Sequence, residues 1–414
     1  MNKDERKTMS KDSIAKKAKD FGITDKKRKT TSVDLMFFLL AGLATFVNTY
    51  SLMGMVHYWV DSYGGFGFLM MIFMSNVGGF SAFLFYKRLF GHVAQRTILL
   101  IVPAYVFTMV TILVLTGKFI EGQTNVLKII INMFVNYSIG VSLFILRYVY
   151  ASIVFKRGPT EVAFFNAGMP IAGIGTTGVA MLLLQYVDEK LHFEQCLVYI
   201  GFQLACLGWI LMATLLFFRQ EEQYKIVKTQ SIIQGIIGPE KPVAVPGLLQ
   251  TGRLIYPMLV STFFAWGITL MILPNMVWAM GLGWENKNFE SQTSLMTYVV
   301  FDFIGRISYR WYVLHSTMAC HYIGLLRTIF IAIPLYAFAS QSNMWMTNVT
   351  WFTLLYIAVH GIITGYISSS LMHIASHRVA KRHKDNTAYL VTLATLFGQL
   401  FGSLCNLLAL RLGD

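Results

Sequence analysis

The chain has 414 residues, of which 55% are apolar and only 13% are charged, and its mean hydropathy is +0.56. Soluble globular proteins carry roughly 25% charged residues, so the composition excludes an ordinary soluble enzyme or binding domain. The formal net charge of +14 would suit a protein that binds nucleic acid, but the positions of the basic residues account for it without such a partner.

Residues 1–34 form a polar segment ahead of the first apolar run. They contain eleven basic and six acidic side chains, a composition that cannot bury a core. We expect a disordered cytoplasmic tail whose lysines contact anionic lipid headgroups. The apolar run that follows is too long for a secretory signal and lacks a small-residue cleavage site.

The rest of the chain contains a series of apolar runs, each close to the length of about 20 residues that a helix needs to cross a bilayer. Eleven such runs are predicted, at 35–56, 64–86, 97–117, 127–150, 161–184, 197–218, 254–277, 293–314, 321–340, 348–372 and 387–410. The sequence therefore predicts an all-α polytopic membrane protein with eleven transmembrane helices.

The segment 219–253 separates six of these runs from the other five. It contains three prolines and three glycines between Gly235 and Gly247, which is typical of a linker. We therefore expect a 6+5 arrangement, with an N-terminal six-helix half at 35–218, a cytoplasmic linker at 219–253 and a C-terminal five-helix half at 254–414.

The distribution of lysine and arginine predicts the orientation, because loops on the cytoplasmic side carry the excess of basic residues. With the N-terminus inside, 26 of the 34 basic residues fall inside, five outside and three within spans. This bias accounts for the net charge and predicts a cytoplasmic N-terminus and an external C-terminus. It does not identify the membrane, and we expect the plasma membrane.

Several kinds of chemistry lack their sequence signals. The four cysteines have no metal-ligand spacing and are interpreted as packing residues. No phosphate-binding Gly-Lys-Ser/Thr loop and no hydrolase motif is found. His373, His377 and His383 are interpreted as part of a solvated basic loop. We expect neither an enzyme nor a protein that needs a metal or another cofactor.

Asp302 and Arg306 are the most informative residues, because they place opposite charges within the apolar run 295–307. Charge inside a membrane is costly, and its usual interpretation is a functional site with a partner. The i, i+4 spacing puts both side chains on one helical face. A carboxylate and a guanidinium together suit a polar, hydroxyl-bearing solute. The alternative is a structural pair that fastens one helix to another.

Other polar residues within the runs have two interpretations each. Arg327 either joins the Asp302 pair in a three-membered network, which would need water or solute to solvate it, or extends its side chain to the membrane surface. For Arg147, extension to the cytoplasmic surface is favoured. Asn48 and Ser138 either form hydrogen bonds between helices or face a solute.

Motifs along most of residues 35–412 resemble those of equilibrative nucleoside transporters. The most specific is Phe301 followed by Asp302-Phe303-Ile304-Gly305-Arg306, which is similar to the eighth-span Asp-x-x-Gly-Arg signature of that family. Weaker similarities are Arg327 with Pro334, Thr364-Gly365-Tyr366, Ala167–Gly173, and Gly398 with Gly402.

The resemblance implies a fold related to the major facilitator architecture, with a cavity between two helical halves. It implies that Asp302 and Arg306 contact a ribose or steady the groups that do, with Arg327 nearby. First-span and fourth-span residues would surround the base, which points to Asn48, Met53 and Ser138. The first span lacks the family's Trp-Asn pair and the fourth its common Gln, so the chain resembles a divergent member.

The expected function is a membrane transporter for nucleosides or nucleobases, including purine uptake, that works by alternating access. Its partners would be the small-molecule substrate and membrane lipids, with no nucleic acid. Transport down a gradient needs no cofactor, although Asp302 is a candidate carrier for a coupled proton. The alternatives are a transporter of another small organic solute, or a non-transporting scaffold whose buried charges are structural.

Overall fold

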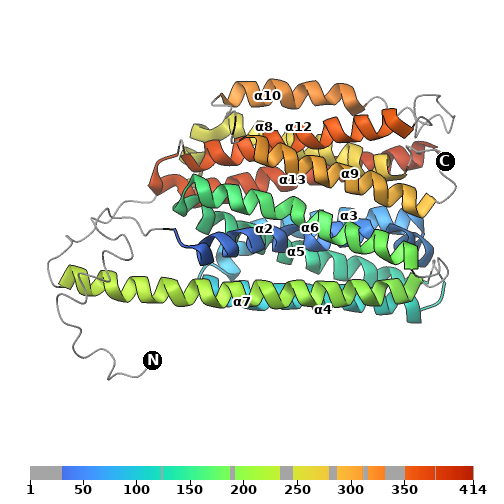
Figure 1. The fold of residues 1–414 in the computed structure, drawn as a ribbon, viewed down its shortest axis with the longest axis horizontal. Coiled ribbons are helices and arrows are strands. Elements are labelled where there is room, and N and C mark those ends of the chain that lie inside the picture. The colour runs from blue at the N-terminus through green and yellow to red at the C-terminus, as the bar shows by residue number, and fades with distance from the viewer. Residues whose placement is uncertain are drawn as a thin grey trace.

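The computed structural model describes residues 30–122, 125–186, 192–233, 246–278, 287–309, 311, 316–331, 350–377 and 379–413. Over these residues the chain forms eleven α-helices and two short 3₁₀ segments. The helices run side by side along the long axis of the molecule (Figure 1). The tail 1–29 and residues 332–340 of the expected ninth run, which include Pro334, lie outside the described residues.

The elements are, in chain order, α2 (Ser32–Gly54), α3 (Val56–Leu89), α4 (Gln95–Phe119), α5 (Val126–Arg157), α6 (Pro159–Tyr186), α7 (His192–Ile233), α8 (Leu248–Trp278), α9 (Lys287–Ser308), α10 (Thr317–Leu326), η3 (Arg327–Ile331), α12 (Thr350–His377), η4 (Lys381–His383) and α13 (Lys384–Gly413). Helix α7 has 42 residues, so it continues as helix through the first part of the segment 219–253.

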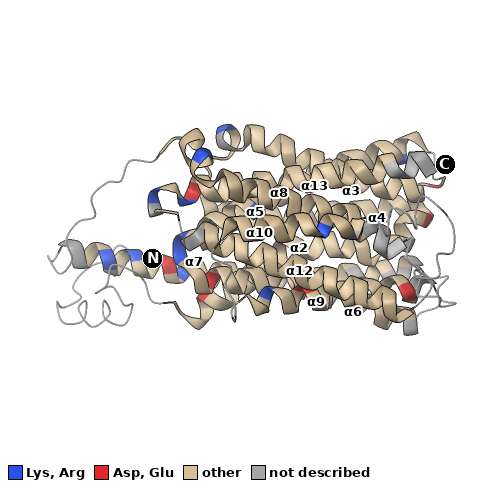
Figure 2. Cartoon of the chain, turned by 90° about the horizontal axis from the view of Figure 1, so that it is seen from above, with Lys and Arg blue, Asp and Glu red and all other residues tan. Residues whose placement is uncertain are grey.

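Nine of the described helices are long and apolar enough to cross a membrane. The other two are α9, which carries four charged residues, and α10, which has 10 residues. Charged side chains lie mainly towards the ends of the bundle (Figure 2). The prediction of an all-α polytopic membrane protein is confirmed, while the expected eighth and ninth crossings, at 293–314 and 321–340, are not among the nine.

Local sequence explains where two of these helices begin or bend. At the start of α2, Thr31 accepts a hydrogen bond from the Asp34 backbone, and the Asp34 carboxylate accepts one from the Thr31 backbone. This capping box satisfies the first free amides of the helix. Helix α3 is interrupted at Gly64, whose φ of 76° is accessible to glycine without the penalty of a side chain.

The first six helices, α2–α7, and the remaining helices, α8–α13, pack against each other along α6 with α9, and along α13 with α3 and α5. Within each set, small residues bring helices to backbone contact. A Cβ atom at Gly168 of α6 would lie only 1.9 Å from the Leu39 carbonyl oxygen of α2. Buried polar side chains from both sets can therefore approach one another in the interior between the two sets.

Candidate functional site

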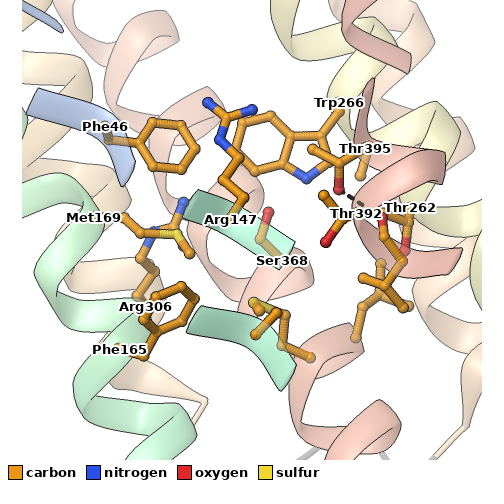
Figure 3. Close-up of a pocket in the computed structure, with 15 residues that line it drawn as sticks. Phe46, Arg147, Phe165, Met169, Thr262, Trp266, Arg306, Ser368, Thr392 and Thr395 are labelled. Atoms are coloured by element: carbon orange, nitrogen blue, oxygen red, sulfur yellow. Dashed lines mark hydrogen bonds between the residues drawn. The ribbon is translucent and has the colours of Figure 1, made fainter. Parts of the chain in front are cut away.

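A hollow of about 620 Å³, part of it open to solvent, lies between the two sets of helices. We call it the central hollow. Its wall comes from α2, α5 and α6 on one side and from α8, α9, α12 and α13 on the other (Figure 3). Most of the lining is apolar, and its polar members are Arg147, Thr262, Arg306, Ser368, Thr392 and Thr395.

Asp302 and Arg306 form the ion pair that their spacing predicts. Arg306 Nε donates to Asp302 Oδ2 at 2.8 Å, and the two side chains are 2% and 1% exposed for arginine and aspartate respectively. Arg306 lines the central hollow, and its Nη1 lies 3.3 Å from the Met169 sulfur. Asp302 does not line the hollow. The carboxylate therefore holds the guanidinium on the side away from the hollow, and the guanidinium faces the hollow.

Helix α12 holds this pair in place through a glycine. A Cβ atom at Gly365 would lie 2.1 Å from the Asp302 carbonyl oxygen and 2.9 Å from Asp302 Oδ1. The backbones of α9 and α12 are thus in direct contact at the level of the pair. Among the residues that the structure describes, Asp302 Oδ1 has no hydrogen-bond partner, which leaves one strong acceptor unused.

Arg327 is fully buried, and neither of its two predicted arrangements is observed. Its Nη2 donates to Thr269 Oγ1 at 2.7 Å, and its Nη1 donates to the Ala265 carbonyl at 3.2 Å. Nη2 also contacts His360 Nε2 at 3.3 Å. A guanidinium only donates, so His360 Nε2 accepts and the ring proton lies on Nδ1. No ion pair joins Arg327 to Asp302 within the described ranges, and Arg327 does not line the central hollow.

The remaining predicted site residues do not reach the central hollow. Asn48 faces a separate hollow of about 340 Å³ among α2, α4, α5 and α7, where Gln203 also lies. Met53 lines a hollow of about 580 Å³, the second hollow, further towards the end of the bundle where α2 ends. Ser138 is half-buried on α5 and lines none of these three hollows.

Arg147 of α5 belongs to the site although the sequence favoured a surface position. It lines both the central and the second hollow, and its Nη1 donates to Gln399 Oε1 of α13 at 2.8 Å. Its guanidinium carbon lies 4.6 Å from the centre of the Phe46 ring, beside Trp266 (Figure 3). Helix geometry could have argued against the surface position. Ten residues separate Arg147 from the end of α5 at Arg157, which is about 15 Å of helix.

Comparison with known proteins identifies the fold. No protein-family model and no curated protein sequence matches the chain. A bacterial homologue of the iron transporter ferroportin, in its outward-facing state, is similar in structure, with 12% identity over 92% of this chain and 96% of that chain and a TM-score of 0.54. The same homologue with soaked iron gives 12% identity, 92% and 97% coverage and a TM-score of 0.52.

The major facilitator superfamily proton:xylose symporter XylE, bound to 6-bromo-6-deoxy-D-glucose, is also similar, with 12% identity over 90% of this chain and 86% of that chain and a TM-score of 0.51. At this identity the similarity shows the fold alone. The chain is a multi-pass membrane protein with a major-facilitator-like fold, as the sequence predicted. Within the described residues, no group of three or more His, Cys, Asp or Glu side chains could hold a metal ion.

Proposed function

We propose that this chain is a membrane transporter that moves nucleosides, or nucleobases, by alternating access between its two sets of helices. One observation carries the proposal: the Arg306 guanidinium, held by the buried Asp302 carboxylate, faces a hollow walled by both sets. The major-facilitator-like fold supports transport in general. The resemblance of Phe301–Arg306 to the nucleoside transporter signature supports the class of solute.

The lining of the central hollow suits the two parts of a nucleoside. A guanidinium donates hydrogen bonds to hydroxyl oxygens, so Arg306 can hold a ribose. The Phe46 and Trp266 rings are stacked with centroids 5.5 Å apart, and aromatic side chains offer flat surfaces on which a base can stack. When the two sets of helices rock about the bound solute, the hollow would change the side to which it opens.

The proposed transport is facilitative or coupled to protons. Asp302 is the candidate proton carrier, because Oδ1 lacks a hydrogen-bond partner in the described part of the chain. Uptake into liposomes with and without an imposed pH gradient separates the two modes. Accumulation above the external concentration only with the gradient supports coupling, and identical uptake in both conditions supports facilitated diffusion.

Transport itself is tested with the purified protein in liposomes. We expect saturable uptake of labelled inosine or adenosine, with competition by nucleosides and little competition by amines. Competition by amines or sugars without uptake of nucleosides would favour a transporter of another organic solute. The absence of uptake for every solute in the panel, with intact protein, would favour a scaffold in which Asp302 and Arg306 only join α9 to its neighbours.

A further inference from the structure

Arg147 lies where the central hollow and the second hollow meet, and it bridges the two sets of helices. Its Nη1 is engaged by the Gln399 amide oxygen across the interface between α5 and α13. Its Nε is buried and lacks a hydrogen-bond partner among the described residues. Nη1 is therefore bound to a neutral acceptor, whereas the Nε–H donor, on another edge of the guanidinium, is available to a solute.

The charge of Arg147 is not balanced by a carboxylate. No ion pair to Arg147 is present within the described ranges, whereas the other guanidinium of the central hollow, that of Arg306, has Asp302. A buried donor left without an acceptor is costly. The site therefore favours a solute that brings hydrogen-bond acceptors to Arg147.

The surroundings of Arg147 favour a flat solute with its acceptors along one edge. The guanidinium lies 4.6 Å from the centre of the Phe46 ring, and Phe46 is stacked on Trp266 with 23° between the ring planes. A guanidinium binds two adjacent acceptors in its own plane. Among purines, that edge is the O6 and N7 pair of a 6-oxopurine, which arginine binds with two parallel hydrogen bonds.

We propose that Arg147 recognises the O6 and N7 atoms of a 6-oxopurine and selects inosine and guanosine over adenosine. This inference rests on the proposed nucleoside transport. Adenine carries an amino donor in place of O6, and this donor would face the guanidinium donors of Arg147. The solute would bind along the edge that carries Nε, and the bond from Nη1 to the Gln399 amide oxygen, between α5 and α13, would remain.

The first test uses the wild-type protein in liposomes, with labelled inosine as the probe. Unlabelled 7-deazainosine lacks N7, and purine riboside lacks O6. We expect each to compete on the order of tenfold more weakly than inosine, because each loses one of the two hydrogen bonds. Guanosine should compete as well as inosine. Equal competition by all four nucleosides would overturn the assignment.

The second test is the substitution Arg147→Gln, because glutamine pairs with the N6 and N7 atoms of adenine as arginine pairs with O6 and N7. The ratio of inosine to adenosine uptake should decrease by on the order of tenfold or more. Arg253→Gln, at an exposed position of α8, is the matched control and should keep the wild-type ratio.

The outcomes separate this inference from the proposed function. Uptake of both nucleosides with an unchanged ratio in Arg147→Gln overturns the role of Arg147 and leaves nucleoside transport intact. Failure of wild-type liposomes to take up either nucleoside removes both proposals. If Arg147→Gln does not fold, the competition series on the wild-type protein decides alone.

Discussion

Replacing Gly365 with alanine should push α9 and α12 apart at the level of the Asp302–Arg306 pair. The added Cβ atom would lie 2.1 Å from the Asp302 carbonyl oxygen and 2.9 Å from the Arg306 backbone nitrogen. Ordinary contacts of a Cβ atom begin at 3.4 Å. Because the obstructing atoms belong to the backbone, a rotamer change cannot relieve the overlap, and the helices must separate by about 1 Å.

Separating α9 from α12 should lower both the stability of the protein and its transport activity. Forcing an additional methyl group into a packed interior costs about 1–3 kcal/mol, and the shift also moves the carboxylate that orients Arg306. We expect a lower melting temperature of the purified protein in detergent, together with a loss of inosine uptake in liposomes.

Gly208→Ala is the matched control, because a Cβ atom at Gly208 in α7 would meet nothing within 4 Å. In a helix this change should be neutral or stabilise the protein by about 0.4–1 kcal/mol. The two variants should therefore differ in the sign of their effect. A Gly365→Ala protein that melts at the wild-type temperature and transports normally would refute the backbone contact between α9 and α12 at this position.

Two further substitutions test the buried cations. Asp302→Asn removes the carboxylate from Arg306 and should reduce uptake by on the order of tenfold or more in folded protein. A purely structural role predicts loss of folded protein instead. Fluorescence size-exclusion chromatography beside the uptake assay distinguishes these two outcomes. Thr269→Val removes the 2.7 Å acceptor of Arg327 and should lower stability by about 1–3 kcal/mol, measured by thermal unfolding. Thr297→Val, whose hydroxyl donates within its own helix, is its control and should cost less; equal costs would contradict the role given to Thr269.

The fold was predictable because the membrane leaves few alternatives. A backbone in lipid must satisfy its hydrogen bonds internally, so apolar runs of the right length become helices whatever their detailed sequence. The Asp302–Arg306 pair was predictable for a similar reason, since an i, i+4 contact is fixed by the helix itself. Both predictions depend on local geometry alone.

The surroundings of the other polar residues were not predictable, because they depend on how each helix is rotated. A helix that is apolar on all sides, such as α2, gives little sign of which face looks inward. Asn48 accordingly faces α4 and α7 instead of the central hollow. The partners of Arg327, Thr269 and His360, lie 58 and 33 residues away in the chain, and no short motif connects them.

Helix α7 is much longer than a membrane requires. Its 42 residues extend over about 63 Å, roughly twice the thickness of the hydrocarbon core, and one end projects past the neighbouring helices (Figure 1). At the base of the projecting part, Gln220 and Glu221 contact Thr31 and Arg157, at the ends of α2 and α5. The projecting part should therefore move as a rigid body with the first set of helices. Because its end lies far from the bundle, a tilt of that set would displace a spectroscopic label at this end by more than it displaces the helices of the bundle.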